Sequence, residues 1–204
     1  MLKHFFKFIS YFFHPINFSI AGAFIYFLFI PKYISKEQEH LILVVIFLIT
    51  YVFPVIILFL LKKFKMIKSY RMGSIEERKF PTLLFITLTF IIGNWLFKST
   101  VVDILSIFYF GYGLALLISY ILLHFQIKIS LYATAVSGLI GFAMYYSYYF
   151  QLNLLILIAL LFILSGLVIT SNLKLKAHKC SEVTYGASLG LLSQLLVFIL
   201  YYNI

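Results

Sequence analysis

Seven long apolar runs, separated by short polar segments, dominate the hydrophobic pattern of the chain. They cover residues 18–33, 41–61, 82–97, 104–123, 129–150, 152–170 and 183–202. A helix rises about 1.5 Å per residue, so roughly 20 apolar residues cross a hydrocarbon layer of ~30 Å. Backbone groups in lipid must be paired, and the runs lack the alternation of barrel strands. The pattern therefore predicts an all-α integral membrane protein, a bundle of six to seven transmembrane helices.

Amino-acid composition indicates whether the basic residues contact lipid or nucleic acid. The chain is 64% hydrophobic, 20% aromatic and 11% charged, with a formal net charge of +10. These values lie outside the range of a soluble domain. With so little polar surface, the basic residues are better explained by phospholipid headgroups than by nucleic acid. We therefore expect membrane lipid as a partner and no nucleic acid, and a protein partner is left open.

The polar segments are predicted to share one membrane face. They are residues 62–81, 124–132 and 171–186, and two predicted helices separate each from the next. Residues 1–13 mix basic residues with phenylalanines and predict an interfacial anchor. With the N-terminus on the same face, that face carries 13 basic residues, against three on the other. The positive-inside tendency places the N-terminus and the polar segments in the cytoplasm. One membrane domain, residues 1–204, accounts for the whole chain.

His178 is the first candidate for chemistry. Glu182 follows four residues later, within reach on a helix, and a carboxylate there would fix the imidazole tautomer. In the segment 62–81, Arg71 and Arg78 are spaced so that two guanidiniums could hold one phosphate. The simpler interpretation is a basic loop at the headgroups. No metal site or cofactor is expected, because His178 and Cys180 have no further ligands at suitable spacing.

The third polar segment carries the most specific spacing. It contains Ser171 and Asn172, then five residues to His178, then three residues to Glu182. This spacing resembles the motif Ser-Arg-x5-His-x3-Asp of the type 2 phosphatidic acid phosphatase superfamily, the membrane relatives of vanadium haloperoxidases. The resemblance covers roughly residues 60–200.

The other two motifs of that family resemble the remaining polar segments, in the same order. The first, Lys-x6-Arg-Pro, is matched by Arg71, six residues and Arg78, with Pro81 three positions late. The second, Pro-Ser-Gly-His, is matched by residues 129–132, which include Ser130 and Tyr132. The sequence is similar to compact bacterial members, which implies a bacterial inner membrane.

The resemblance implies a reaction and a role for each residue. His178 would attack phosphorus to form a phosphohistidine, oriented by Glu182. Four other residues would hold the phosphate oxygens: Arg71, Arg78, Ser130 and Asn172. Tyr132 would stand where the family has a histidine that protonates the leaving group. The expected substrate is an anionic, phosphate-bearing lipid: a lipid phosphate or an isoprenyl pyrophosphate.

Several departures from the family pattern leave a second function open. A phenol has a pKa near 10 and donates a proton less readily at neutral pH than an imidazolium, so Tyr132 is a poor acid. Asn172 replaces a phosphate-binding arginine, and Glu182 is one methylene longer than aspartate. His124 is a candidate for the missing proton donor. The alternative is a catalytically inactive relative that binds an anionic lipid headgroup or serves as a membrane partner subunit. A transporter is less favoured because no charge lies clearly within a span.

Overall fold

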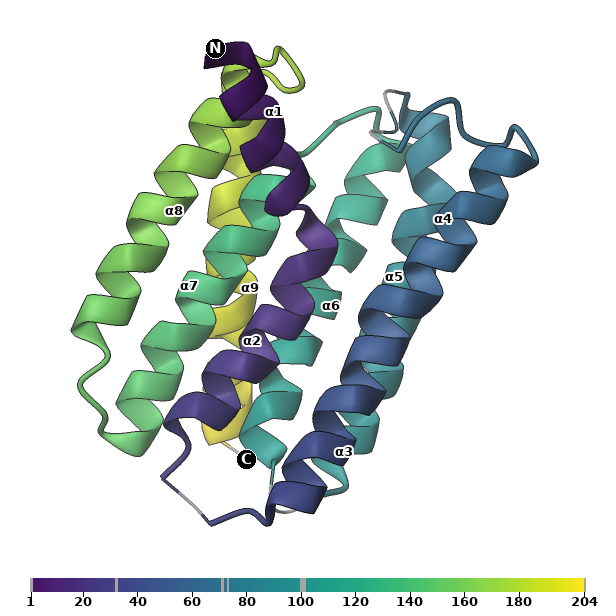
Figure 1. Ribbon diagram of the computed structural model, residues 1–204. Coiled ribbons are helices and arrows are strands. Elements are labelled where there is room, and N and C mark those ends of the chain that lie inside the picture. The colour runs from purple at the N-terminus through teal and green to yellow at the C-terminus, as the bar shows by residue number, and fades with distance from the viewer. Residues whose placement is uncertain (1, 32, 71, 73, 100–101, 204) are drawn as a thin grey trace.

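The computed structural model describes residues 2–31, 33–70, 72, 74–99 and 102–203, and within these ranges every regular element is a helix (Figure 1). In chain order the elements are α1 (Leu2–Phe12), α2 (Pro15–Phe29), α3 (Lys36–Phe47), the π-helical segment η1 (Leu48–Val52), α4 (Phe53–Lys63), α5 (Ile75–Phe97), α6 (Asp103–His124), α7 (Leu131–Phe150), α8 (Leu155–Lys174) and α9 (Cys180–Tyr202). The all-α prediction is confirmed.

Five candidate spans occur among the described residues, judged by helix length and apolar character. They are the continuous segment Lys36–Lys63 together with α5, α6, α8 and α9. The pair His4–Phe12 and Pro15–Phe29, bent by 56°, raises the number to six if it forms one broken span. α7 is not among them, because its glycines, serines and tyrosines lower its hydropathy. These helices are compatible with an integral membrane protein, and the predicted count of six to seven is not confirmed.

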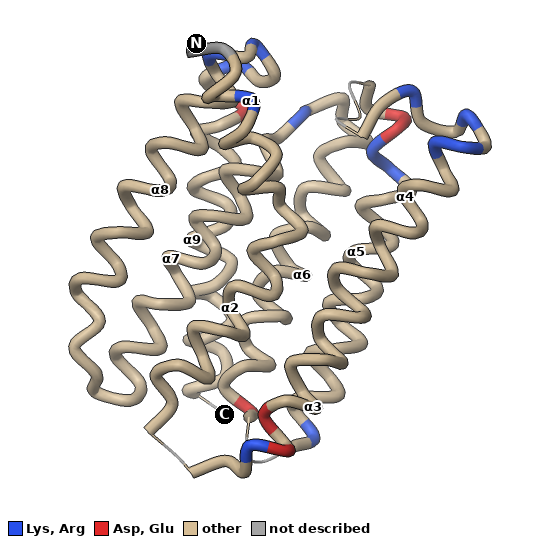
Figure 2. Tube along the Cα trace, in the orientation of Figure 1, with Lys and Arg blue, Asp and Glu red and all other residues tan. Residues whose placement is uncertain are grey.

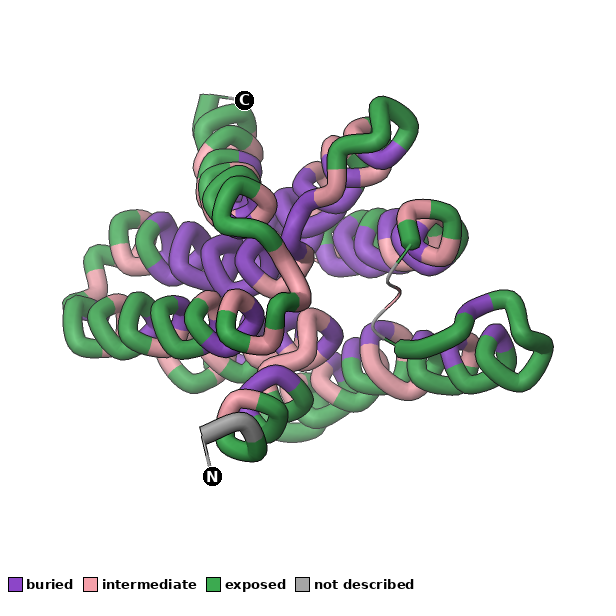
Figure 3. The backbone as a smooth tube through the Cα atoms, turned by 90° about the horizontal axis from the view of Figure 1, so that it is seen from above, coloured by how far each residue is buried: buried purple, intermediate pink, exposed green. Residues whose placement is uncertain are grey.

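The helices form a bundle whose centre is occupied by α6 and α7. These two helices carry the longest sets of buried residues, and the view from above shows buried backbone gathered at the centre of the bundle (Figure 3). α8 lies along one outer edge and α3 with α4 along the other, while α2 crosses the bundle (Figure 1). Large apolar side chains on the outer helices are exposed, among them Leu28 and Ile156. An apolar exterior is what a lipid-facing bundle requires.

Close packing of α7 against α9 depends on two glycines spaced four apart. A Cβ at Gly186 would lie 2.6 Å from Ser130 O, and one at Gly190 would lie 2.1 Å from Thr134 O. Small residues at this spacing let two helix backbones approach closely in a membrane. The N-terminal ends of α7 and α9 therefore meet side by side, which brings the second and third polar segments together.

Two prolines set local breaks in the helices. Pro15 begins α2 directly after the α1–α2 bend. Pro54 has no N–H to give to the carbonyl four residues earlier, and the preceding turn η1 is π-helical, with Phe53 N bonded to Leu48 O. Such π-helical turns are frequent beside functional sites.

α5 begins earlier than the third predicted apolar run, at 82–97. Ser74 caps it, since its Oγ accepts a hydrogen bond from Glu77 N at 3.3 Å. A serine followed three residues later by glutamate is a recognised helix start. The helix therefore begins within the charged segment 62–81, although the charges there suggested a loop. Arg78 consequently lies on the first turns of a helix rather than in a loop.

Lysine and arginine gather at one end of the bundle (Figure 2). This end holds the α4–α5 connection, the loop before α7 and the α8–α9 connection, together with the start of α1. The cytoplasmic location of this end stays a prediction.

Candidate anion-binding site

Arg78 ties the start of α5 to the loop that leads into α7. The residue is only 6% exposed. Its Nε donates to Met72 O over 2.8 Å, and its Nη1 donates to Ile129 O over 3.2 Å. Because a guanidinium stays protonated and presents its donors in one plane, these two bonds fix a positive charge beside the loop.

Ser130 joins that loop to both α7 and α9. Its Oγ accepts from Ala133 N at 3.4 Å and caps α7, and its own N–H donates to Glu182 O at 3.0 Å. Lys128 lies in the same loop. Burial and the neighbouring Arg78 lower the pKa of Lys128, whereas Glu182 opposes that change. The loop thus places a second cation near the first and next to the start of α9.

His178 lies just before α9 and is oriented by Glu182. Its Nδ1 is 2.7 Å from Glu182 Oε2, and the two side chains are 4% and 16% exposed. A carboxylate only accepts, so Nδ1 carries the proton and Nε2 keeps its lone pair. Burial lowers the pKa of His178 from its ordinary value, an effect that the hydrogen bond donated to Glu182 opposes and that Arg78 reinforces. The lowered pKa favours the neutral imidazole, in which Nε2 is the unprotonated nitrogen.

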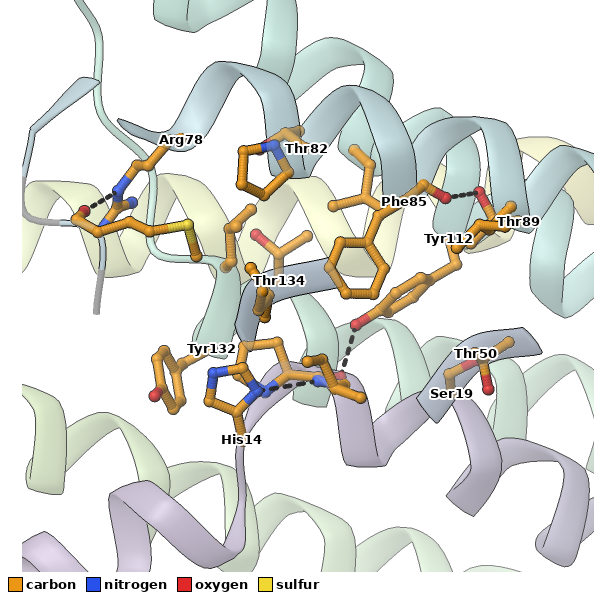
Figure 4. A pocket seen from close by; sticks show the side chains of 18 of the residues that line it. His14, Ser19, Thr50, Arg78, Thr82, Phe85, Thr89, Tyr112, Tyr132 and Thr134 are labelled. Carbon is orange, nitrogen blue, oxygen red and sulfur yellow. Dashed lines mark hydrogen bonds between the residues drawn. The ribbon is translucent and has the colours of Figure 1, made fainter. Parts of the chain in front are cut away.

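Two of these groups, those of Arg78 and His178, line a cavity between α2, α4, α5, α6 and α7, whereas Glu182, Ser130 and Lys128 are not among its lining residues. Arg78 and His178 line it together with His14 and Tyr132. Figure 4 shows Arg78 across the cavity from His14 and Tyr132, at the end opposite Tyr112. Most of the remaining lining is apolar, including side chains at positions 16, 58, 85, 88 and 116. A cavity with a basic end and an apolar body suits an amphiphile with an anionic headgroup.

The structure does not bring every predicted site residue to this cavity. Asn172 is 1% exposed inside α8, its Nδ2 donates to Val168 O at 2.9 Å, and it is not among the residues that line the cavity. Ser130 lies beside the cavity, through its neighbour Leu131, and does not line it either. Arg71 lies outside the described residues.

His124 does not line the cavity. It ends α6 and is exposed, and its Nδ1 lies 3.1 Å from Tyr120 O in its own helix. His124 thus lies outside the residues that line the cavity, and its replacement of the family's acid histidine stays a prediction.

His14 is the cavity residue that the sequence reasoning missed. Its ring meets the Tyr132 ring edge to face, with centroids 5.6 Å apart. The available signal was the pair His14-Pro15 at the start of the first apolar run, because proline favours the first helical position and marks the residue before it as a cap.

Among the described residues, no three or more histidine, cysteine, aspartate or glutamate side chains lie close enough to hold a metal ion. The chain matches no protein-family model, no curated protein and no solved structure. Function must therefore be inferred from the geometry of the site and from the spacing of the three motifs.

Proposed function

We propose that the chain is a membrane phosphatase that removes phosphate from a lipid phosphate or an isoprenyl pyrophosphate through a phosphohistidine at His178. The observation that carries this proposal is the His178–Glu182 pair, whose imidazole lines a cavity that has Arg78 at its basic end and a mostly apolar lining elsewhere. The carboxylate holds the imidazole with Nε2 unprotonated, which is the form that attacks phosphorus.

The neighbouring residues support the phosphate-transfer step. Charge on the phosphoryl oxygens needs fixed positive donors, and Arg78 and Lys128 supply two cations around one carboxylate. In the proposed reaction His178 Nε2 bonds to phosphorus as the bond to the leaving oxygen breaks. Water then cleaves the phosphorus–nitrogen bond and releases inorganic phosphate. A pyrophosphate substrate has the better leaving group and depends less on a proton donor.

Binding of a phosphate headgroup without cleavage is a second candidate function, favoured by the hydrogen bonds of Arg78 and by the position of Tyr132. Two of the guanidinium nitrogens already donate to backbone carbonyls, and Tyr132, a weak acid, lines the cavity in place of an imidazole. A site built in this way would bind a phosphate headgroup without cleaving it. On this alternative the protein is a lipid-binding relative or a partner subunit.

Phosphate release separates the two functions. Detergent-purified protein is supplied with phosphatidic acid or an isoprenyl pyrophosphate, and wild type is compared with His178→Ala and with the exposed His124→Ala. The phosphatase proposal predicts release by wild type and by His124→Ala, and only background release by His178→Ala. Equal background from all three would exclude the enzyme, and retained lipid binding would then identify the binding relative.

A further inference from the structure

A second imidazole reaches the same cavity from the break between α1 and α2. His14 is the N-cap of α2, and its Nδ1 accepts a hydrogen bond from Ile16 N at 3.4 Å. Pro15, between them, has no N–H to compete. A nitrogen that accepts must carry the lone pair, so the proton of the neutral ring is on Nε2.

Capping alone does not require an imidazole at this position. Ser35, Ser74 and Ser130 cap α3, α5 and α7 through their hydroxyls. Serine, threonine, asparagine and aspartate are the usual N-caps, and histidine is not one of them. The size of the ring, however, lets His14 both cap α2 and extend its far nitrogen toward the cavity.

The far nitrogen of His14 is placed to meet a ligand. The residue lines the cavity that Arg78 and His178 also line. Its ring stands edge to face against Tyr132, which limits its rotation. Figure 4 shows the ring beside Tyr132 with Arg78 on the opposite side of the cavity. Within the described residues, the only hydrogen bond of His14 uses Nδ1, so Nε2–H has no partner there.

We propose that His14 is a binding residue for the phosphate group, donating a hydrogen bond from Nε2–H to a phosphate oxygen while the ring stays neutral. This inference rests on the proposed function, because it assigns a third donor to the same anion site. Burial of His14 and the N-terminus of α2 both favour the neutral ring: burial disfavours the charged form, the positive dipole end disfavours an imidazolium, and protonation would break the bond from Ile16. A neutral imidazole held by a helix N-terminus is an established donor to negative oxygen in enzymes.

Two substitutions separate donation from capping. His14→Ser keeps a capping oxygen and removes the donor, whereas His14→Gln restores a side chain N–H of greater reach. The probe is phosphatidic acid in detergent micelles, with phosphatidylcholine as the control lipid. Binding is measured in a His178→Ala background so that the lipid is not consumed.

A hydrogen bond to a charged group sets the expected size of the effect. His14→Ser should weaken phosphatidic acid binding about 10- to 100-fold, and His14→Gln should recover most of that loss. The melting temperature of His14→Ser should stay close to that of the parent, because serine still caps α2.

The outcomes distinguish this inference from the phosphatase proposal. Equal binding by His14→Ser and the parent would overturn the role of His14 alone. So would equal losses in His14→Ser and His14→Gln accompanied by a lower melting temperature, since the ring would then be structural. If the parent binds phosphatidic acid and phosphatidylcholine equally, the role of His14 fails, and the phosphatase proposal is decided by phosphate release alone. If phosphate release is absent but His14→Ser weakens binding selectively, the enzyme proposal fails and the role of His14 stands.

Discussion

Replacing Gly190 by alanine tests whether close packing of α7 and α9 positions the site. The added Cβ would lie 2.1 Å from Thr134 O and 2.3 Å from Ser137 Oγ. The serine hydroxyl can rotate away, but the carbonyl belongs to the backbone of α7 and cannot. Since Cβ contacts below 3.0 Å are essentially never seen, the two helices must separate by about 1 Å.

The cost of that separation can be bounded. Overpacking costs about 1–3 kcal/mol, and a clash with rigid backbone falls at the upper end, near 3 kcal/mol. Separation would also stretch the bond from Ser130 N to Glu182 O, 3.0 Å long, which joins the two ends of the site. We therefore expect Gly190→Ala to lose both stability and phosphate release.

Gly166→Ala is the matched control for this experiment. It adds the same methyl to a helix, on α8, where no neighbouring atom lies within 4 Å. Its free energy of unfolding should change by no more than about 1 kcal/mol, in the stabilising direction expected from helix propensity. Unfolding is followed in detergent by titration with a denaturing surfactant. Equal midpoints for Gly190→Ala and Gly166→Ala would refute the packing argument.

Substitutions at two further residues, Glu182 and Arg78, test the electrostatics of the site. Glu182→Gln removes a bond that raises the pKa of His178 against burial, so the acid limb of phosphate release should move to lower pH and the rate near pH 7.5 should fall about 10-fold. A pH–rate profile measures both, and a limb that moves to higher pH would contradict the assignment. Arg78→Met leaves the carbonyls of Met72 and Ile129 without their donor, which predicts a loss of about 1–3 kcal/mol in unfolding free energy and weaker phosphatidic acid binding. Arg78→Lys should restore part of the phosphatidic acid binding, because it keeps the positive charge. It should restore less of the stability, because one ammonium group is a poorer match to both carbonyls than a guanidinium.

The helices could be predicted from the sequence because apolar runs in lipid have few alternatives to helix. The start of α5 could not be placed, since the charges of residues 62–81 obscured the capping serine at position 74. The predicted number of spans, six to seven, is not confirmed, because helix length alone does not decide which helices cross a membrane. α7 packs against α9 through glycines and other small residues, and its tyrosines lower its mean hydropathy. A count of spans based on hydropathy therefore leaves α7 out.

Part of the candidate site could be predicted from the spacing of the motifs. Glu182 follows His178 by four positions, a separation that allows contact where the chain coils, and the structure has that contact although His178 lies just before α9. The spacing could not predict which distant segments lie next to one another in the folded chain. His14 is more than 160 residues from His178, and only the packing of α2 against α7 brings it to the same cavity. The same limit applies to Asn172, whose spacing matched the motif although its side chain bonds within α8.

The central claim, that His178 becomes phosphorylated, is tested most directly by trapping the intermediate. Protein mixed with an isoprenyl pyrophosphate is quenched in alkali, where a phosphorus–nitrogen bond survives, and the site of phosphate is located by mass spectrometry. We predict one phosphate on the peptide that contains His178, lost on acid treatment and absent from His178→Ala. Rapid phosphate release without any phosphate on that peptide, or equal release by His178→Ala, would contradict the account.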